Sequence, residues 1–176
     1  MDITVDTIKE LREMTSCGVI ECKNALEEAG GDLDKAKKIL QKRGLELAVK
    51  KGGRDAREGR IETYIHQGAK IGVLLEVSCE TDFVAKNDSF CELTKDIAMQ
   101  IAATNPTYVK REDVPKDVLA EEDDPEAFIK EKCLLEQPFV KDPKRTIQDC
   151  VVAIVSSMGE NIFINRFVRY KVNEVE

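Results

Sequence analysis

Apolar residues in the first quarter of the chain recur at helical spacing in three short groups. A break at residues 15–18 separates the first group from the second, and Gly30-Gly31 end the second. Thr4 and Asp32 stand where they can cap the first and third helices. The pattern therefore predicts three helices, the last of which closes at Gly44. Their inward-facing residues are Val5, Ile8, Leu11, Cys22, Ala25, Leu26, Ala29, Leu33, Ala36, Ile39 and Leu40.

A bundle of about 40 residues buries little core and is marginally stable alone, so such a module usually docks onto something else. Gly18, Val19 and Ile20 are candidates for that contact, although they would equally serve to seal the bundle. The polar, glycine-containing run Lys50–Arg54 predicts a hinge or a frayed helix end. We therefore place a domain boundary near residue 53, with a docking domain and linker over 1–53 and a core domain over 54–176.

The hydrophobic period changes to two after Arg60, which is typical of strands. Residues 61–65 alternate, residues 67–70 form a turn, and residues 71–79 return as a more fully apolar strand. This pair predicts an antiparallel hairpin with one face covered by helices. A strongly periodic helix over 88–103 is the natural cover, with Phe90, Leu93, Ile97 and Ile101 on one face.

The last third of the chain supplies further helices and a returning strand. We expect residues 104–125 to be polar and irregular, 125–135 to be helical, and 137–143 to form a rigid turn. A core-facing helix over 146–157 follows. Residues 161–172 alternate as a strand, with Ile162, Ile164, Val168, Tyr170 and Val172 on one side and Phe163 and Phe167 on the other. The fold class is therefore α+β: a small antiparallel three-stranded sheet backed by helices, after an N-terminal three-helix domain.

The residues between the second strand and the following helix, Glu80–Asn87, place an aromatic ring at a corner between two rigid elements. Loops mounted on a rigid scaffold carry function more often than cores do. Two structures fit this stretch. Phe83 folds under the corner as core while Asp82 caps the turn, or Phe83 protrudes as a probe. Residue chemistry alone favours the buried alternative, because a single apolar loop residue usually needs no functional explanation.

Composition excludes several classes of protein. The 176 residues are 42% hydrophobic and 35% charged, which is enough apolar content for a core and too much for a disordered chain. The net charge of −7 argues against direct nucleic-acid binding, which normally needs a basic face. No apolar run approaches the roughly 18 residues of a membrane span. The N-terminus lacks a basic segment followed by an apolar one, so we expect a cytoplasmic protein with no membrane partner.

The chemistry-bearing residues do not form a recognisable catalytic or metal site. Six cysteines occur without a C-x-x-C pair, as expected for reduced core thiols, and His66 is the single histidine. No phosphate-binding glycine loop is present, and no carboxylates pair convincingly as acid and base. A redox enzyme using Cys17 and Cys22 is disfavoured, because their spacing lacks the C-x-x-C geometry. We therefore expect an interaction protein with no cofactor and no bound metal, rather than an enzyme.

Several segments, in the same order along the chain, resemble the elongation factor Ts family. The resemblance spans essentially the whole chain, and no one segment would be specific alone. The segments are Ile8–Thr15, Cys22–Leu26, Gly31–Ala36, Glu80–Ala85, Asp96–Ala103, Leu134–Asp142, Asn161-Ile162 and Arg166–Arg169.

The resemblance implies a guanine-nucleotide exchange factor for the translational GTPase elongation factor Tu. It implies that residues 1–44 are a ubiquitin-associated-like domain that docks on the GTPase. It also implies that Thr81, Asp82, Phe83 and Val84 dislodge Mg²⁺ in the partner, with the phenylalanine wedged between two helices. Under this resemblance the protruding alternative for Phe83 is favoured over the buried one.

The chain has a single sheet-forming core after residue 60, whereas longer family members carry a duplicated core. It is similar to the short form, in which two copies associate. We therefore expect a homodimer through the sheet or the C-terminal strand, with Phe163 or Phe167 as contacts. The alternative function is a helical adaptor whose N-terminal module binds an unrelated partner while the corner is only structural.

Overall fold

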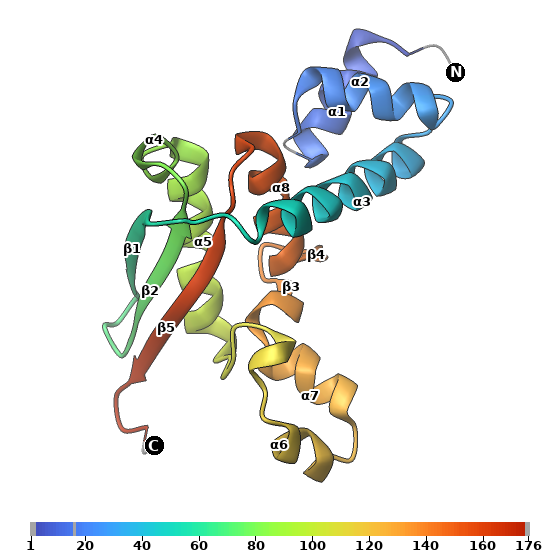
Figure 1. Cartoon of the computed structure of the whole chain (residues 1–176). Coiled ribbons are helices and arrows are strands. Elements are labelled where there is room, and N and C mark those ends of the chain that lie inside the picture. Colours follow the sequence, from blue (N-terminus) through green and yellow to red (C-terminus); the bar gives the residue numbers. More distant parts are fainter. Residues whose placement is uncertain (1–2, 16, 175–176) are drawn as a thin grey trace. The chain divides into compact units, whose positions relative to one another are not determined.

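A computed structural model describes residues 3–15 and 17–174 (Figure 1). Ser16 of the predicted helix break, and Met1 and Asp2 of the N-terminus, lie outside the described residues, as do Val175 and Glu176. The elements are α1 (Val5–Thr15), α2 (Val19–Glu28), α3 (Leu33–Lys51), β1 (Glu58–Ile65), β2 (Ile71–Cys79), α4 (Asp82–Ala85), α5 (Asp88–Thr104), the 3₁₀ turn η1 (Arg111–Asp113), α6 (Lys116–Glu121), α7 (Pro125–Lys132), the 3₁₀ turn η2 (Leu134–Glu136), β3 (Pro138–Phe139), β4 (Asp142–Thr146), α8 (Ile147–Met158) and β5 (Phe163–Lys171). The predicted α+β class is confirmed. None of the helices in these ranges has both the length and the hydropathy to cross a membrane.

The chain divides into two compact units. The first comprises the residues up to Asp55 together with Val151–Ile162, and the second comprises Ala56–Cys150 with the residues from Phe163 onward. The helical segment 151–162, which the sequence prediction gave to the core domain, thus belongs with the N-terminal helices.

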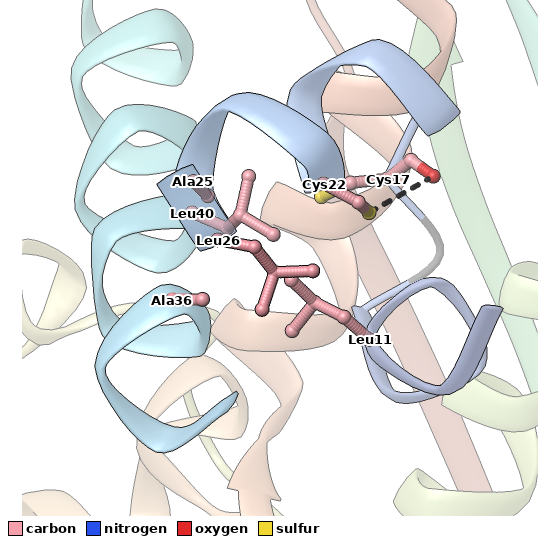
Figure 2. Close-up of a cluster of buried hydrophobic side chains, with 7 residues drawn as sticks. All are labelled: Leu11, Cys17, Cys22, Ala25, Leu26, Ala36 and Leu40. Atoms are coloured by element: carbon pink, nitrogen blue, oxygen red, sulfur yellow. Dashed lines mark hydrogen bonds between the residues drawn. The ribbon is translucent and has the colours of Figure 1, made fainter. Parts of the chain in front are cut away.

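The first unit contains the three predicted helices around one small core. Side chains from α1, α2 and α3 meet there (Figure 2). The caps follow the sequence: the Thr7 amide donates to Thr4 Oγ1 at 3.2 Å, and the Lys35 amide donates to Asp32 Oδ1 at 3.0 Å. Gly30 has a positive φ of 63°, as a residue just past a helix end commonly does. The core residues are Leu11, Cys17, Cys22, Ala25, Leu26, Ala36 and Leu40.

The prediction that α3 ends at Gly44 is wrong, because the helix continues to Lys51. Gly44 instead marks a close contact with α8: a Cβ at this position would lie 2.6 Å from Val152 Cγ1 and 2.8 Å from Ser156 Oγ. Glycine is therefore required here for helix packing rather than for a turn. The end of α3 is tied to the same segment, since Lys51 Nζ donates to the Gly159 carbonyl.

The second unit is built on an antiparallel sheet of order β1-β2-β5, as predicted. Helix α5 runs along one face of this sheet (Figure 1). Alternate residues of β2 point toward α5 and are buried, and they meet the apolar stripe of the helix. The core-facing residues are Val73, Leu75, Val77 and Cys79 of β2 and Phe90, Leu93, Ile97 and Ile101 of α5.

A bulge in β5 changes which of its residues share a face. The pairing with β2 shifts between Glu76 and Val77, so that Ile164 and Phe167 both pair with core-facing residues. Phe163, Val168 and Tyr170 pair with residues of the opposite face. The predicted common side for Ile164, Val168 and Tyr170 is therefore wrong, because an extra residue in a bulge inverts the alternation beyond it.

The remaining elements lie between α5 and α8 in the sequence. The segment predicted as irregular contains η1 and α6, and Asp124 caps α7 by accepting from the Ala127 amide at 3.0 Å. The predicted turn at 137–143 is part of a short β3–β4 hairpin. Helix α8 begins, near the predicted start at residue 146, with a cap in which the Asp149 amide donates to Thr146 Oγ1 at 3.1 Å.

Candidate functional site

The corner after β2 is a single turn of helix, α4, rather than the loop that the sequence predicted. Thr81 is its N-cap, with extended backbone and a side-chain oxygen that accepts from the Val84 amide at 3.4 Å. The last residues close the turn, since the Lys86 amide donates to the Asp82 carbonyl at 3.2 Å. Asn87 then caps α5 by accepting from the Ser89 amide at 2.9 Å. Two successive caps thus fix the path of the chain between β2 and α5.

Phe83 and Val84 have opposite environments within this turn. Phe83 is 82% exposed, whereas Val84 is 8% exposed and belongs to the core. Successive residues of an α-helix point about 100° apart, so burying one neighbour directs the other away. The structure therefore excludes the alternative in which Phe83 folds under the corner. Burying a phenylalanine stabilises a fold by roughly 1.5–3 kcal/mol, and this protein does not use that gain.

Asp82, beside the exposed ring, is paired with Lys86 one turn later. Lys86 Nζ lies 2.7 Å from Asp82 Oδ2, and both side chains are largely exposed. The hydrogen bond and positive charge of Lys86 hold the pKa of Asp82 below its ordinary value, and the same contact raises the pKa of Lys86. Asp82 thus carries a full negative charge at neutral pH. Lys86 was not among the predicted site residues, although an acid and a base four residues apart on a helix signal such a pair.

Two cysteine side chains also contact the backbone at the corner. Cys79 Sγ, at the end of β2, donates to the Thr81 carbonyl at 3.2 Å. Cys91 Sγ, in the first turn of α5, donates to the Ala85 carbonyl at 3.7 Å. The backbone that carries Asp82 and Phe83 is therefore contacted at both ends by buried or half-buried side chains.

The other predicted contact residues lie at the start of α2 in the first unit. Gly18 is the N-cap of α2, and its amide donates to Glu21 Oε2 at 3.2 Å. Val19 and Ile20 are 52% and 74% exposed, so they do not seal the three-helix core. They present an apolar pair to solvent at this helix end. Thr81–Val84 lie together at the start of α4 in the second unit, and Gly18–Ile20 lie together at the start of α2 in the first.

The cysteines provide no reactive pair. All six lie within the described residues, and none forms a disulfide there. Cys17 and Cys22 are buried in the three-helix core, where Cys22 Sγ donates to the Cys17 carbonyl at 3.8 Å (Figure 2). Burial raises the pKa of Cys22, which is opposite to the shift that a nucleophilic thiol needs. Among the described residues, no cluster of three or more histidine, cysteine or acidic side chains is arranged to hold a metal.

The sheet face opposite α5 is apolar and exposed. Phe163 lies on this face, whereas Phe167 pairs with Leu75 on the covered one. An ion pair between Glu76 and Arg166, at 2.7 Å, crosses the middle of the face. Its exposed apolar residues are Ile61, Ile65, Leu74, Phe163, Val168 and Tyr170.

Comparisons with known proteins agree with this architecture. A family model described as "Elongation factor TS" matches residues 33–126 and 125–174. Elongation factor Ts of Carboxydothermus hydrogenoformans is 49% identical over an alignment of 195 positions, which covers 98% of this chain and 90% of the relative. Elongation factor Ts of Thermodesulfovibrio yellowstonii is 47% identical over 198 positions, which cover 100% of this chain and 99% of the relative.

The fold and these relatives define an α+β translation elongation factor. The chain belongs to the elongation factor Ts family. The resemblance found in the sequence segments is confirmed over nearly the full chain.

Proposed function

We propose that this protein is a guanine-nucleotide exchange factor that binds the GDP-bound form of elongation factor Tu and promotes release of GDP. The observation that carries the proposal is the contrast within α4. Phe83 is exposed on a turn that is capped and anchored by Val84. A ring held in this way is suited to insertion between elements of a partner, because little conformational entropy is lost on binding.

The target of the insertion is the magnesium site of the partner. Mg²⁺ requires near-ideal octahedral geometry and is held by few protein ligands together with phosphate oxygens and waters. A ring that displaces the supporting backbone spoils this geometry and weakens the hold on GDP. Thr81 and Val84 position the turn, and Phe83 is the wedge.

Asp82 acts beside the wedge through its charge. Its carboxylate is ionised at neutral pH and rests against Lys86. An exposed ion pair of this kind is weak, so Asp82 can exchange Lys86 for the water shell of the magnesium ion. A carboxylate near these waters competes for their hydrogen bonds and helps to displace the metal.

The exchange requires no covalent step, so the protein needs no cofactor and is not an enzyme in the strict sense. A factor that binds the empty GTPase more tightly than the GDP-bound form weakens GDP binding by the same ratio. Incoming GTP then displaces the factor.

The protein acts in the cytoplasm, where translation occurs, and contacts the GTPase rather than nucleic acid. The apolar start of α2, at Gly18, Val19 and Ile20, docks the N-terminal domain on this partner.

The test is release of a fluorescent GDP analogue from purified elongation factor Tu, with the wild-type protein and with Phe83→Ala. We expect the wild type to accelerate release and the variant to lose most of that effect while its circular dichroism stays unchanged. If both proteins accelerate release equally, the exchange function stands and the role assigned to Phe83 is wrong. No acceleration by either would favour the adaptor alternative.

A truncation distinguishes the adaptor further. Under the adaptor alternative, removing residues 1–50 abolishes all partner binding, whereas under the exchange proposal the remaining chain keeps some contact through residues 81–84. Circular dichroism of the truncated chain must first show that it folds, because α3 packs on α8 through Gly44.

We further propose that the protein is a homodimer through the open face of its sheet. A solvated face of an antiparallel sheet normally alternates to polar residues, whereas this one carries six exposed apolar side chains. Contiguous exposed apolar surface indicates an interaction site. Phe163 is on this face and is the expected contact, and Phe167 is not, because it faces α5. Sedimentation should give about twice the chain mass of 19.8 kDa, and a monomer at tens of micromolar would contradict the dimer.

A further inference from the structure

On the side of the sheet that faces α5, β1 carries the ion pair Arg60–Glu62. The paired residues of β2, Val77 and Leu75, are aliphatic. Glu62 is buried and pairs across the sheet with Leu75. Its Oε2 accepts from Arg60 Nε at 2.9 Å and from Thr94 Oγ1 at 3.1 Å. Its Oε1 accepts from the Thr63 amide at 3.3 Å. The carboxylate is thus fully engaged between the sheet and α5.

Glu62 is buried, whereas the Arg60 side chain keeps 35% of its surface exposed, so only the carboxylate is largely desolvated. That desolvation offsets part of the attraction, and apolar replacements of similar volume are often neutral or stabilising, so the pair is weak evidence for a stabilising role. Such pairs are better explained by what they orient than by what they stabilise. Glu62 fixes the guanidinium of Arg60, which in turn contacts Cys91 of α5.

Arg60 of β1 is connected to α4 through a single side chain, the thiol of Cys91. Arg60 Nη1 lies 3.0 Å from Cys91 Sγ, and Cys91 Sγ lies 3.7 Å from the Ala85 carbonyl. A thiol both accepts and donates weakly, so Cys91 can accept from Arg60 and donate to Ala85 at the same time. Thr94 lies in the same turn of α5, and its single hydroxyl proton is shared between Glu62 Oε2 and the Cys91 carbonyl, which is 3.0 Å away.

Helix α4 depends on such outside contacts. It is a single turn, and the first turn of a helix is unfavourable to form alone, since many dihedral angles are fixed for one hydrogen bond. Thr81 holds its beginning through the cap. Ala85 is its last residue, and Cys91 contacts the carbonyl there. The contact from Cys91 therefore acts on the end of α4 that the cap does not hold.

We propose that Arg60 and Cys91 are positioning residues that fix the C-terminal end of α4 and so set the direction in which Phe83 points. Glu62 and Thr94 hold Arg60 and Cys91 in place. This inference rests on the proposed exchange function for its consequence, because a constrained ring loses less entropy on insertion. The constraint on α4 itself can be measured without any partner.

The first experiment is amide hydrogen exchange in the full chain of Cys91→Ala, Cys91→Ser and the control Cys133→Ala. Cys133 is buried in a separate cluster with Val114 and Ile129, so the control removes the same sulfur away from α4. We expect the amides of Ala85, Lys86 and Asn87 to exchange about threefold to tenfold faster in Cys91→Ala, the range of one weak hydrogen bond. Cys91→Ser, which retains a donor and acceptor, should lie between Cys91→Ala and the wild type.

A second variant separates positioning from stability. The double replacement Arg60→Met with Glu62→Leu substitutes apolar side chains for the ion pair and should leave global unfolding near the wild-type value. It still removes the guanidinium from Cys91. We expect the same faster exchange of the amides of Ala85, Lys86 and Asn87 in this variant, with the amides of α5 unchanged.

GDP release supplies the functional measurement. Cys91→Ala should lower the release rate at saturating factor about threefold while changing the half-saturating concentration less, because the wedge and not the docking is affected. Faster α4 amide exchange without any acceleration of GDP release by the wild type would keep the positioning role and reject the exchange function. Unchanged α4 exchange in Cys91→Ala, or equal changes in Cys133→Ala, would overturn the positioning role.

Discussion

The second unit exposes apolar side chains in two places that differ in kind. On α4 a single ring, Phe83, stands on a capped turn beside a charged pair. On the open face of the sheet six apolar side chains from three strands form a flat surface. The first feature depends on a few local contacts, whereas the second depends on the register of the whole sheet.

The two features suit the two associations proposed above. A flat apolar surface gains affinity from area, so it suits a partner of similar flatness such as a second copy of the same sheet. A lone ring contributes little area and acts through where it is placed, so it suits insertion and depends on a rigid support. Substitutions on the sheet should change concentration-dependent association, and substitutions at the corner should change a rate at fixed assembly.

The largest effect is expected from a charge at the centre of the open face. Leu74 lies on the middle strand, between Thr63 of β1 and Val168 of β5. Leu74→Asp should weaken the proposed homodimer on the order of 100-fold or more, because an unpaired carboxylate would be buried in its interface. Sedimentation equilibrium over a concentration series measures this change.

Val140→Asp is the matched control for the dimer, since Val140 is an exposed apolar residue outside the sheet. It should leave the dimer intact. Equal dissociation of both variants, or none in Leu74→Asp, would show that the open face is not the contact.

The two neighbours on α4 give the next largest effect. Val84→Ala should lower the free energy of unfolding by about 1–3 kcal/mol, as expected when buried methyl groups are removed. Phe83→Ala should change it by no more than about 0.5 kcal/mol, because the ring is exposed. Urea denaturation of both variants measures the difference, and similar losses of stability would mean that Phe83 packs against the fold in solution.

The cap of α4 should contribute less. Thr81→Ala removes the acceptor for the Val84 amide and should cost about 0.5–1 kcal/mol, near the lower end for N-caps because the bond is 3.4 Å long. Thr81→Ser keeps the hydroxyl and serves as the control. Loss of GDP release in Thr81→Ala, with release retained in Thr81→Ser, would connect the cap to the wedge. Equal release by both would limit Thr81 to a structural role.

The sequence alone predicted the helices and strands whose signals are local. Periodicity and the caps at Thr4 and Asp32 located helix starts that the structure confirms. Gly44 misled the prediction, because a glycine within a helix that packs closely looks like a glycine at its end. The β5 bulge and the β3–β4 hairpin were missed for another reason: both are set by pairing with distant residues.

The candidate site likewise contains residues that the sequence predicts and residues that only the structure identifies. The motif residues Thr81–Val84 could be found in the sequence, but the choice between a buried and an exposed Phe83 required the structure. Arg60 contacts Cys91 across 31 positions of sequence, and Cys91 contacts the Ala85 carbonyl at the corner, and neither Arg60 nor Cys91 belongs to the motif. Lys86 was the exception, since its spacing from Asp82 was visible and only its contact was not.

The smallest effect concerns the charge at the corner. Lys86 holds the pKa of Asp82 below its ordinary value, so the folded protein releases this proton more readily than the unfolded chain. The stability from the pair is therefore present above the unfolded aspartate pKa of about 3.9, and it is lost as pH falls through the lower folded value. Lys86→Met should raise the Asp82 pKa toward its ordinary value, as followed by carbon NMR of the carboxyl group. Lys141→Met, which removes a 2.6 Å contact to Asp96 instead, should leave the titration of Asp82 unchanged. If Lys86→Met leaves it unchanged as well, then Lys86 is not what holds Asp82, and its carboxylate is free to meet a partner's magnesium waters without first giving up an ion pair.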